Sequence, residues 1–305
     1  MNDAEKHELA KRFRERVAPF VKRHTALLPQ EQSDAVLRQF TPDAEELCYA
    51  EGFSDDPLHE EDADIHPFAD VVHKYPNKIL YLTTDECPVY CRYCTRKRKT
   101  LLSAGHDATP LEKIVEYLRA RPKIHEVIFS GGDPLMLPVH DLLHRMGVFL
   151  SMDSIREVRI HTRAVTTAPN LISVKFLNRL KTLREKFPSK GIAFVLHINT
   201  AAEISIKATQ KITALRALKI PSYAQSVLLK GINDDAAILA ALCRALIYAD
   251  VQPYYLHQLD RVTGAQHFEV DDGRAKKIYN ELKNLVPPYM LPRLMRDSKQ
   301  GKHNL

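Results

Sequence analysis

The sequence has no long apolar run, no apolar core near its N-terminus and only five cysteines. A helix needs about 20 consecutive apolar residues to span a bilayer, and no run in this sequence approaches that length, which predicts that the protein does not span a membrane. The segment Met1–Glu8 is mainly polar and lacks the apolar core of a signal peptide. Because three of the five cysteines lie in one loop, we expect a reducing compartment, and these features together predict a cytoplasmic protein.

The composition is that of a globular protein with a mildly basic charge. The 305 residues, of which 45% are hydrophobic and 27% charged, fit one large domain or a barrel with appendages. The net charge is +6, and the densest basic cluster is Arg92–Lys99. Such a cluster can bind nucleic acid, form a solvated loop or attract the carboxylate of a small substrate. Tyr90 and Tyr93 are too few for a base-stacking platform, so we favour a small-molecule substrate and predict no nucleic-acid partner.

Three cysteines, Cys87, Cys91 and Cys94, are spaced C-x3-C-x2-C directly after an apolar run. A tight loop with three thiolates can hold a soft metal centre. An ordinary iron–sulfur cluster takes four cysteines, so three cysteines leave one iron open to another ligand. Zinc is a competing occupant, although Cys48 and Cys243 lie far away and do not complete a paired zinc motif. Buried cysteines without any metal are the remaining alternative.

The sequence of the first 78 residues predicts a helical region followed by an extended segment, which we call the arm. Residues 4–23 have a helical period, with Leu9, Phe13 and Val17 on one face, and Pro19 makes the end of this helix hard to place. A second short helix is expected at 30–40. The segment from Gly52 to Asp62 is acidic and contains proline, which is typical of a surface loop or of an arm that contacts another subunit. We therefore predict an N-terminal helical and arm region at 1–78, with a homo-oligomer as an open alternative.

From residue 79 onward, short apolar runs alternate with amphipathic stretches, about one βα unit every 30 residues. Strands are predicted near 79–84, 125–130, 156–161, 192–198, 222–229 and 251–257, and helices near 110–121, 139–151, 171–187, 203–218, 235–248 and 272–285. Such repetition predicts a parallel sheet with helices outside. The expected fold class is α/β: a partial (β/α)6 parallel barrel at 79–286, with an N-terminal helical extension and a short C-terminal segment at 287–305.

Polar residues follow the predicted strands, where a parallel sheet carries its functional face. After the cysteine loop of the first strand come, strand by strand, Gly131, Gly132 and Asp133, then Arg163, then His197 and Asn199, then Gln225, and finally His257 and Asp260. Taken alone, the glycines could merely turn the chain, and a lone histidine is more often part of the core. Because all of these residues are expected at one mouth, the set favours an enzyme over a binding module.

The motifs resemble those of the radical SAM superfamily, in which S-adenosylmethionine (SAM) occupies the open iron, and more narrowly those of the lysine 2,3-aminomutase family. The matching stretches are Asp56–Leu58, His73–Lys78, Thr84–Arg98, Ser130–Leu135, Gln225–Asp234, Pro253–Asp260 and Gly264–Phe268. The similarity runs from about residue 52 to about residue 297. The short C-terminus is similar to the version that makes β-lysine for modifying a translation elongation factor.

The resemblance implies an isomerase with three cofactors. A [4Fe–4S] cluster on Cys87, Cys91 and Cys94 would cleave SAM to a 5′-deoxyadenosyl radical. That radical would take a hydrogen from the β-carbon of lysine, or of a lysine-like amino acid, held as an imine with pyridoxal phosphate (PLP). The amino group would then move from the α- to the β-carbon. A reductase, a flavodoxin or a ferredoxin would donate the electron.

The resemblance also implies roles for individual residues. Arg96 would bind the substrate carboxylate, which a planar guanidinium can bind bidentately. Asp260 and Asp297 match the two aspartates that hold the ε-ammonium of lysine. Lys78, with Lys74, stands where arginines often sit near the PLP phosphate. The positions that match cofactor-binding residues are Gly131, Gly132, Asp133, Arg163, His197, Asn199 and Gln225.

The C-terminal tail departs from the family pattern. Lys302 is the candidate catalytic lysine that would hold PLP, but it lies two residues early relative to Asp297, and Lys299 is a second candidate. A frayed, solvated tail is the alternative. Two other functions therefore stay open: a radical SAM enzyme without PLP that acts on an unknown substrate, and a basic RNA-binding protein.

Overall fold

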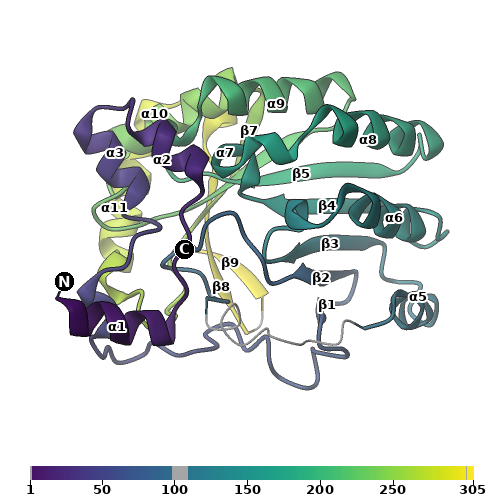
Figure 1. Cartoon of the computed structure of the whole chain (residues 1–305), viewed down its shortest axis with the longest axis horizontal. Coiled ribbons are helices and arrows are strands. Elements are labelled where there is room, and N and C mark those ends of the chain that lie inside the picture. Colours follow the sequence, from purple (N-terminus) through teal and green to yellow (C-terminus); the bar gives the residue numbers. More distant parts are fainter. Residues whose placement is uncertain (1, 98–108, 300) are drawn as a thin grey trace.

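The computed structural model describes residues 2–97, 109–299 and 301–305, and within them one nine-stranded sheet runs in the order β1 to β9 (Figure 1). The strands are β1 (Val71–Tyr75), β2 (Lys78–Thr84), β3 (Glu126–Gly131), β4 (Glu157–Thr162), β5 (Gly191–His197), β6 (Ser222–Val227), β7 (Val251–His257), β8 (Arg293–Ser298) and β9 (Gly301–Asn304). Strands β2 to β8 pair in parallel, each with the next along the chain. The outer strands β1 and β9 pair antiparallel with β2 and β8.

Helices precede the sheet and connect its parallel strands. The α-helices are α1 (Asp3–Arg12), α2 (Pro19–Thr25), α3 (Gln30–Leu37), α5 (Leu111–Arg119), α6 (Val139–Leu150), α7 (Ala164–Thr167), α8 (Val174–Lys186), α9 (Ile206–Ala217), α10 (Ala236–Tyr248) and α11 (Asp272–Leu285). Short 3-10 turns are η1 (Ala44–Leu47), η2 (Pro134–Met136), η3 (Pro169–Leu171), η4 (Ala201–Glu203), η5 (Gln266–Phe268) and η6 (Pro288–Met290). Side chains of Ser173, Ser205, Asp235 and Asp271 accept hydrogen bonds from the first turns of α8, α9, α10 and α11, which fixes where these helices begin.

The main core lies between the sheet and the helices that cover it. Val127 and Phe129 of β3 are fully buried in one cluster with Leu118 of α5 and Phe149 of α6. The rings of Phe129 and Phe149 meet edge to face, with their centroids 5.8 Å apart. Because alternate strand residues point to this core, the residues between them face the inside of the curved sheet.

The six predicted strands and the six helices that follow them are confirmed, each within about three residues of its predicted ends. The prediction of one helix at 4–23 is wrong, because the chain leaves the helix after Arg12 and begins α2 at Pro19. Proline fits the first turn of a helix, where its missing N–H is not needed, so it begins the second helix rather than interrupting the first. The frayed-tail alternative is also wrong, because β8 and β9 form an antiparallel pair.

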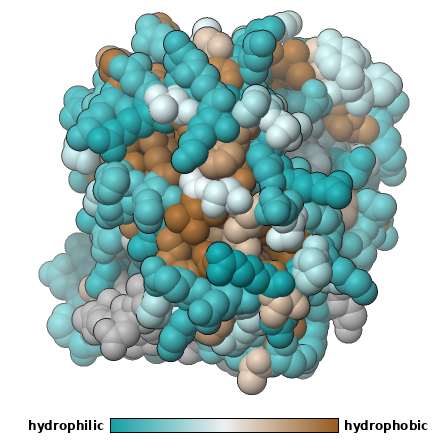
Figure 2. Space-filling model, turned by 90° about the vertical axis from the view of Figure 1, so that its right-hand side faces the viewer, coloured by the Kyte–Doolittle hydropathy of each residue, from teal (hydrophilic) through white to brown (hydrophobic). Residues whose placement is uncertain are grey.

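The N-terminal helices pack on the same molecule rather than forming a separate body. Val21 of α2, Val36 of α3 and Phe40 make a small apolar cluster with Val89 of the cysteine loop. Figure 1 shows these purple elements gathered at one side of the sheet. No helix among the described residues is long and apolar enough to cross a membrane. The face in Figure 2 is largely hydrophilic, with a smaller group of hydrophobic residues near its middle.

Candidate active site

The cysteine loop follows β2, and hydrogen bonds from the N-terminal region fix its backbone. Arg16 donates a hydrogen bond from Nη1 to the Cys87 carbonyl oxygen at 2.8 Å, and the Tyr90 N–H donates to the Arg16 carbonyl at 3.0 Å. The Arg92 N–H donates to the Gln39 carbonyl at 2.9 Å. The loop is therefore fixed by residues that lie 50 or more positions earlier in the chain.

The basic residues that follow the first cysteines are mostly buried. Arg92 is 1% exposed and donates from Nε and Nη2 to the two carboxylate oxygens of Glu46, each at 2.8 Å. Lys97 is 3% exposed and donates to the Arg92 carbonyl at 2.8 Å. Arg98 and Lys99 lie outside the described residues. Buried and ion-paired cations cannot reach nucleic-acid phosphates, so this part of the cluster does not support the RNA-binding alternative.

The three cysteines are free thiols in the structure. Burial raises the pKa of Cys87 well above its ordinary value and also raises the pKa of Cys94, so thiolates here need a cation or a metal to offset their desolvation. Within the described ranges, no group of three or more His, Cys, Asp or Glu side chains is arranged to hold one metal ion. A single zinc ion needs all its ligands on one atom, whereas the cysteines of a four-iron cluster each bind a different iron. Three thiolates in one loop leave one iron of a four-iron cluster open to another ligand, so the donor set fits such a cluster.

Gly131, Gly132 and Asp133 join the end of β3 to the start of the cysteine loop. Gly131 has φ +108°, and a Cβ there would lie 2.6 Å from the carbonyl oxygen of Thr84. A Cβ on Gly132 would collide with the carbonyl oxygen of Glu86. The buried Asp133 carboxylate accepts hydrogen bonds from Thr162 Oγ1 at 2.8 Å and from the backbone N–H of Arg163, also at 2.8 Å. These contacts position the loop; a direct contact of the three residues with a cofactor stays a prediction.

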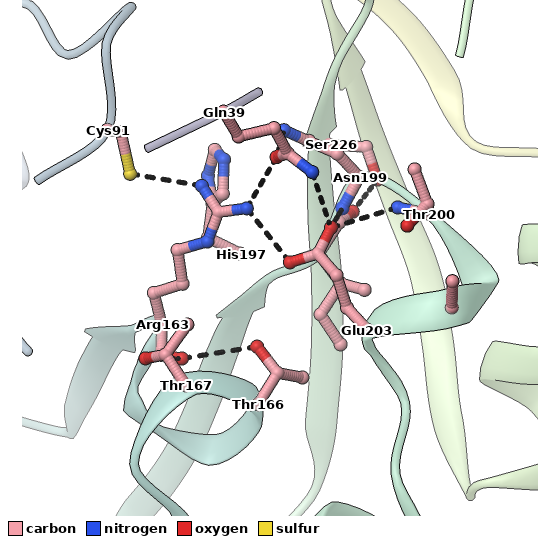
Figure 3. Close-up of polar contacts among 12 residues, drawn as sticks. Gln39, Cys91, Arg163, Thr166, Thr167, His197, Asn199, Thr200, Glu203 and Ser226 are labelled. Atoms are coloured by element: carbon pink, nitrogen blue, oxygen red, sulfur yellow. Dashed lines mark hydrogen bonds and ion pairs between the residues drawn. The ribbon is translucent and has the colours of Figure 1, made fainter. Parts of the chain in front are cut away.

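Arg163, Asn199 and His197 meet in a buried polar network beside the cysteine loop (Figure 3). Arg163 donates from Nη1 to Cys91 Sγ at 3.0 Å and from Nη2 to Glu203 Oε2 at 2.8 Å. Asn199 Nδ2 donates to the Tyr93 hydroxyl oxygen at 2.6 Å, and that hydroxyl lies 2.9 Å from His197 Nε2. Burial, followed by the Arg163 charge, holds the pKa of His197 well below its ordinary value, so this ring is neutral.

Gln225 lies beside this network. It pairs with His197 across the parallel strands β5 and β6, so the two predicted cofactor residues are neighbours. The Glu203 and Gln39 side chains also belong to this network, although neither lies in one of the motifs that resemble the family. Glu203 ends a capping box that begins at Thr200, and this spacing is the signal that could have located its buried carboxylate.

A second group of charges lies around the C-terminal hairpin. Lys302 Nζ is 2.9 Å from Asp297 Oδ2 and 3.3 Å from His257 Nε2. Burial, and after it the charge of the neighbouring Asp297, together raise the pKa of Asp260 to about 7. Burial lowers the pKa of His257 to about 3. The structure thus brings the two predicted substrate aspartates to one place with the predicted catalytic lysine.

Arg96 belongs to the same mouth but already has an anionic partner. Its Nη2 donates to both carboxylate oxygens of Glu60, at 2.6 and 2.7 Å. Burial by itself lowers the pKa of Arg96, but the negative charges of Glu60 and Cys94, and more weakly that of Asp260, outweigh it and raise this pKa above its ordinary value. Arg96 Nε is buried and, within the part of the chain that is described, has no hydrogen-bond partner. Glu60 is a site residue that the sequence motifs did not reveal.

The other lysines predicted to lie near PLP, Lys299, Lys74 and Lys78, have different surroundings from Lys302. Lys299 Nζ lies 2.6 Å from Asp62 Oδ2 in a partly exposed ion pair. Lys74 donates to the carbonyl oxygen of Ser298, and Lys78 lies over the ring of Tyr75, 4.5 Å from its centroid. Of the two candidates for holding PLP, Lys302 is therefore the one beside the aspartates.

His161 on β4 is a further residue that the sequence reading missed. Its Nε2 is buried without a hydrogen-bond partner among the described residues. Burial lowers the pKa of His161 well below its ordinary value, with added repulsion from Arg159 and Lys302. The alternation of β4, in which Val158 and Ile160 face the helices, could have placed His161 on the inner face.

Comparison with known proteins agrees with this geometry. The Radical SAM superfamily model matches residues 81–242. The L-lysine 2,3-aminomutase of Haemophilus influenzae is 38% identical over 252 residues, which are 83% of this chain and 72% of that protein. The enzyme of the same name from Escherichia coli is 38% identical over 266 residues, or 87% and 75% of the two chains. The chain belongs to the lysine 2,3-aminomutase family of radical SAM proteins.

The fold of this family member is also found in a solved structure. A radical SAM methyltransferase from Sphaerobacter thermophilus matches with a TM-score of 0.50 and 18% identity, over 74% of this chain and 68% of that one. At this identity the likeness concerns the fold alone. Membership in the lysine 2,3-aminomutase family implies a [4Fe–4S] cluster, SAM and PLP. The thiol set of the cysteine loop and the position of Lys302 fit these groups.

Proposed function

We propose that this member of the lysine 2,3-aminomutase family moves the α-amino group of lysine, or of a lysine-like amino acid, to the β-carbon. The observation that carries the proposal is the meeting of Asp260, Asp297 and Lys302 at the mouth that also contains Arg96. A substrate with a carboxylate at one end and an ammonium at the other is complementary to this charge pattern. An amino acid without the distant ammonium would leave the two aspartates unpaired.

Arg96 would bind the substrate carboxylate. The unpartnered, buried Nε–H of Arg96 is a donor that needs an acceptor, and Nε together with Nη2 forms the fork that a carboxylate prefers. Since Glu60 already occupies Nη2, the substrate carboxylate has to displace Glu60 or share this nitrogen with it. Glu60 thus holds the Arg96 side chain in place before substrate binds.

Asp260 and Asp297 would bind the ε-ammonium. Asp260 has a pKa of about 7, so an arriving ammonium favours its ionised form. In the structure Asp297 is paired with Lys302. If Lys302 holds PLP, its ammonium charge is lost, and Asp297 can then bind the substrate ammonium instead. The two aspartates and the lysine therefore exchange partners as the site fills.

The cofactors would be held by separate parts of the site. Cys87, Cys91 and Cys94 would hold the cluster, and Lys302 would hold PLP, with Lys78 as a cation for its phosphate. When bound, the cluster and SAM supply the radical and PLP supplies electron delocalisation, while the protein orients the substrate and excludes water. We also propose a cytoplasmic reductase, flavodoxin or ferredoxin as the electron donor. A homo-oligomer stays a prediction. The contacts of the arm that the structure shows, Glu60 with Arg96 and Asp62 with Lys299, are within one chain.

The function is tested by anaerobic reconstitution with iron and sulfide, followed by incubation with SAM, dithionite, PLP and lysine. We expect β-lysine, and we expect none from a Cys94→Ala variant, which lacks one cluster ligand. Formation of 5′-deoxyadenosine without β-lysine would refute the aminomutase proposal while leaving the radical chemistry. That result, together with no PLP absorbance, would favour a PLP-independent radical SAM enzyme.

A further inference from the structure

One of the three cluster cysteines receives a hydrogen bond from a buried cation. Arg163 Nη1 lies 3.0 Å from Cys91 Sγ, and the Arg163 residue is 7% exposed (Figure 3). By contrast, Cys94 Sγ accepts only a longer bond, at 3.4 Å, from the neutral backbone N–H of Arg96, as far as the described residues show. Cys91 therefore differs from Cys94 in having a charged donor on its sulfur.

The guanidinium of Arg163 is held in this position from several sides. Glu203 Oε2 accepts from Nη2 at 2.8 Å and Gln39 Oε1 accepts from Nη2 at 2.5 Å. The Tyr93 hydroxyl accepts from Nη1 as well, and the plane of Phe40 lies under the guanidinium, 4.5 Å from its carbon atom. A long side chain fixed by this many contacts has few other orientations, so its bond to Cys91 is part of the folded structure.

These contacts also leave the terminal nitrogens of Arg163 without a free N–H for a cofactor or substrate. Both terminal nitrogens already have acceptors, so the fork of Arg163 is not open for a carboxylate of SAM or substrate. The charge of Arg163 is balanced by one carboxylate, Glu203, which points at Nη2 rather than Nη1. The donor that faces the cluster is thus an ordered N–H of a cation whose counter-ion lies on its other side.

We propose that Arg163 is a positioning residue that raises the reduction potential of the cluster through its hydrogen bond to Cys91 Sγ. Reduction adds one electron, delivered by a low-potential one-electron donor, and takes the cluster from its 2+ to its 1+ state with no bond made or broken. The added charge is shared with the thiolate sulfurs, so a cationic donor on one sulfur stabilises the reduced state more than the oxidised state. The inference rests on the proposed function only in requiring a cluster on Cys87, Cys91 and Cys94.

The test compares the midpoint potential of the reconstituted cluster in the unmutated chain, Arg163→Gln and Arg163→Lys, by EPR-monitored titration without SAM or substrate. We expect a lower potential in Arg163→Gln, at unchanged iron and sulfide content. Arg163→Lys keeps the charge but loses the fork, so we expect an intermediate potential. The matched control is Arg159→Gln, which removes a partly buried arginine from β4 itself, four residues before Arg163; its Nε lies 2.6 Å from Glu126 Oε1, and among the described residues it has no bond to a cysteine.

Equal potentials in Arg163→Gln and the unmutated protein would overturn the inference, as would an equal fall in Arg159→Gln. If Arg163→Gln binds no cluster, Arg163→Lys decides: a lowered potential supports the inference and an unchanged one overturns it. Failure of the unmutated chain to bind a cluster would instead contradict the proposed function. A cluster with the expected shifts but without β-lysine formation would refute the aminomutase and leave the role of Arg163 supported.

Discussion

At the scale of single residues, the protonation state of each charged group at the mouth is set by burial and by its charged neighbours. Asp260 lies near Asp297 and Lys302, and its carboxyl holds a proton up to about pH 7 because burial and the second carboxylate both disfavour the anion. Lys302 compensates Asp297 at 2.9 Å but only partly offsets the shift of Asp260. In the proposed function a lysine substrate would bring a second cation to the pair of aspartates, so we expect this residue cluster to select diamino acids.

The raised pKa of Asp260 predicts how stability depends on pH. Between its ordinary value of 3.8 and about 7, the folded protein holds a proton that the unfolded chain has released, so this group's contribution to the free energy of unfolding falls as pH rises. An Asp260→Asn variant lacks the titration, and its advantage in melting temperature over the unmutated protein should grow from pH 4.5 to pH 7.5. Thermal unfolding across this range checks the prediction, and parallel curves for the two proteins would contradict it.

At the scale of elements, an acidic arm reaches across the mouth from the cysteine loop to the C-terminal hairpin. Asp56 accepts hydrogen bonds from the backbone N–H groups of Glu60 at 3.0 Å and Glu61 at 2.9 Å, which shapes the turn that presents Glu60. Glu60 pairs with Arg96 on one side, and Asp62 pairs with Lys299 on the other. The Asp56–Leu58 motif therefore acts through the position of Glu60.

If Arg96 binds the substrate carboxylate as proposed, Glu60 competes with the substrate for this arginine, which predicts the effect of removing the Glu60 charge. We expect Glu60→Gln to bind lysine about tenfold more tightly, which corresponds to about 1.4 kcal/mol. Isothermal titration of the PLP-loaded protein with lysine measures the affinity. Asp62→Asn is the control on the same arm, because its exposed ion pair does not touch Arg96, and it should leave the affinity nearly unchanged. Weaker lysine binding by Glu60→Gln would show that Glu60 only orients Arg96.

The strand end at Gly131 tolerates no side chain. Gly131 combines φ +108° with a Cβ position 2.6 Å from the Thr84 carbonyl oxygen, so Gly131→Ala has to move the start of the cysteine loop. We expect a loss of about 1–3 kcal/mol in the free energy of unfolding, measured in urea, and a lower iron content after reconstitution. The control Gly147→Ala lies inside α6, where its Cβ would be 3.4 Å from Leu183 Cδ1, and it should be neutral or stabilising. Normal stability and iron content in Gly131→Ala would contradict this account.

For the molecule as a whole, the two edges of the sheet approach each other. Strands β1 and β9 are at opposite ends of the strand order, yet the Lys302 N–H donates to the Tyr75 hydroxyl at 3.1 Å and Lys74 donates to the Ser298 carbonyl. A Cβ on Gly301, which has φ +116°, would lie 3.1 Å from the Tyr75 ring. The hairpin thus nearly closes the partial barrel and brings Lys302 to the mouth.

This closure predicts which lysine holds PLP. Lys302→Ala should lose the visible absorbance of bound PLP while keeping its iron, because the Lys302 side chain contacts Asp297 and His257 and, among the described residues, no cysteine. Lys299→Ala is the matched control, since Lys299 is 53% exposed at its side chain and pairs with Asp62, and it should keep the absorbance. Retained absorbance in Lys302→Ala, or its loss in Lys299→Ala, would assign the role to a different residue.

The sequence alone determined the six βα units and the cysteine loop, because periodicity and spacing are local properties that survive without knowledge of distant contacts. The family was indicated by the resemblance of the motifs and not by periodicity. The prediction of one helix at 4–23 is wrong because a proline can either interrupt a helix or begin one, and Pro19 begins α2. Only the tertiary structure revealed Glu60 and Glu203 as partners of Arg96 and Arg163, and only it separated Lys302 from Lys299. Such pairs join residues 36 to 227 positions apart, as for Glu60 with Arg96 and Tyr75 with Lys302, and a buried charge leaves no periodic trace in the sequence.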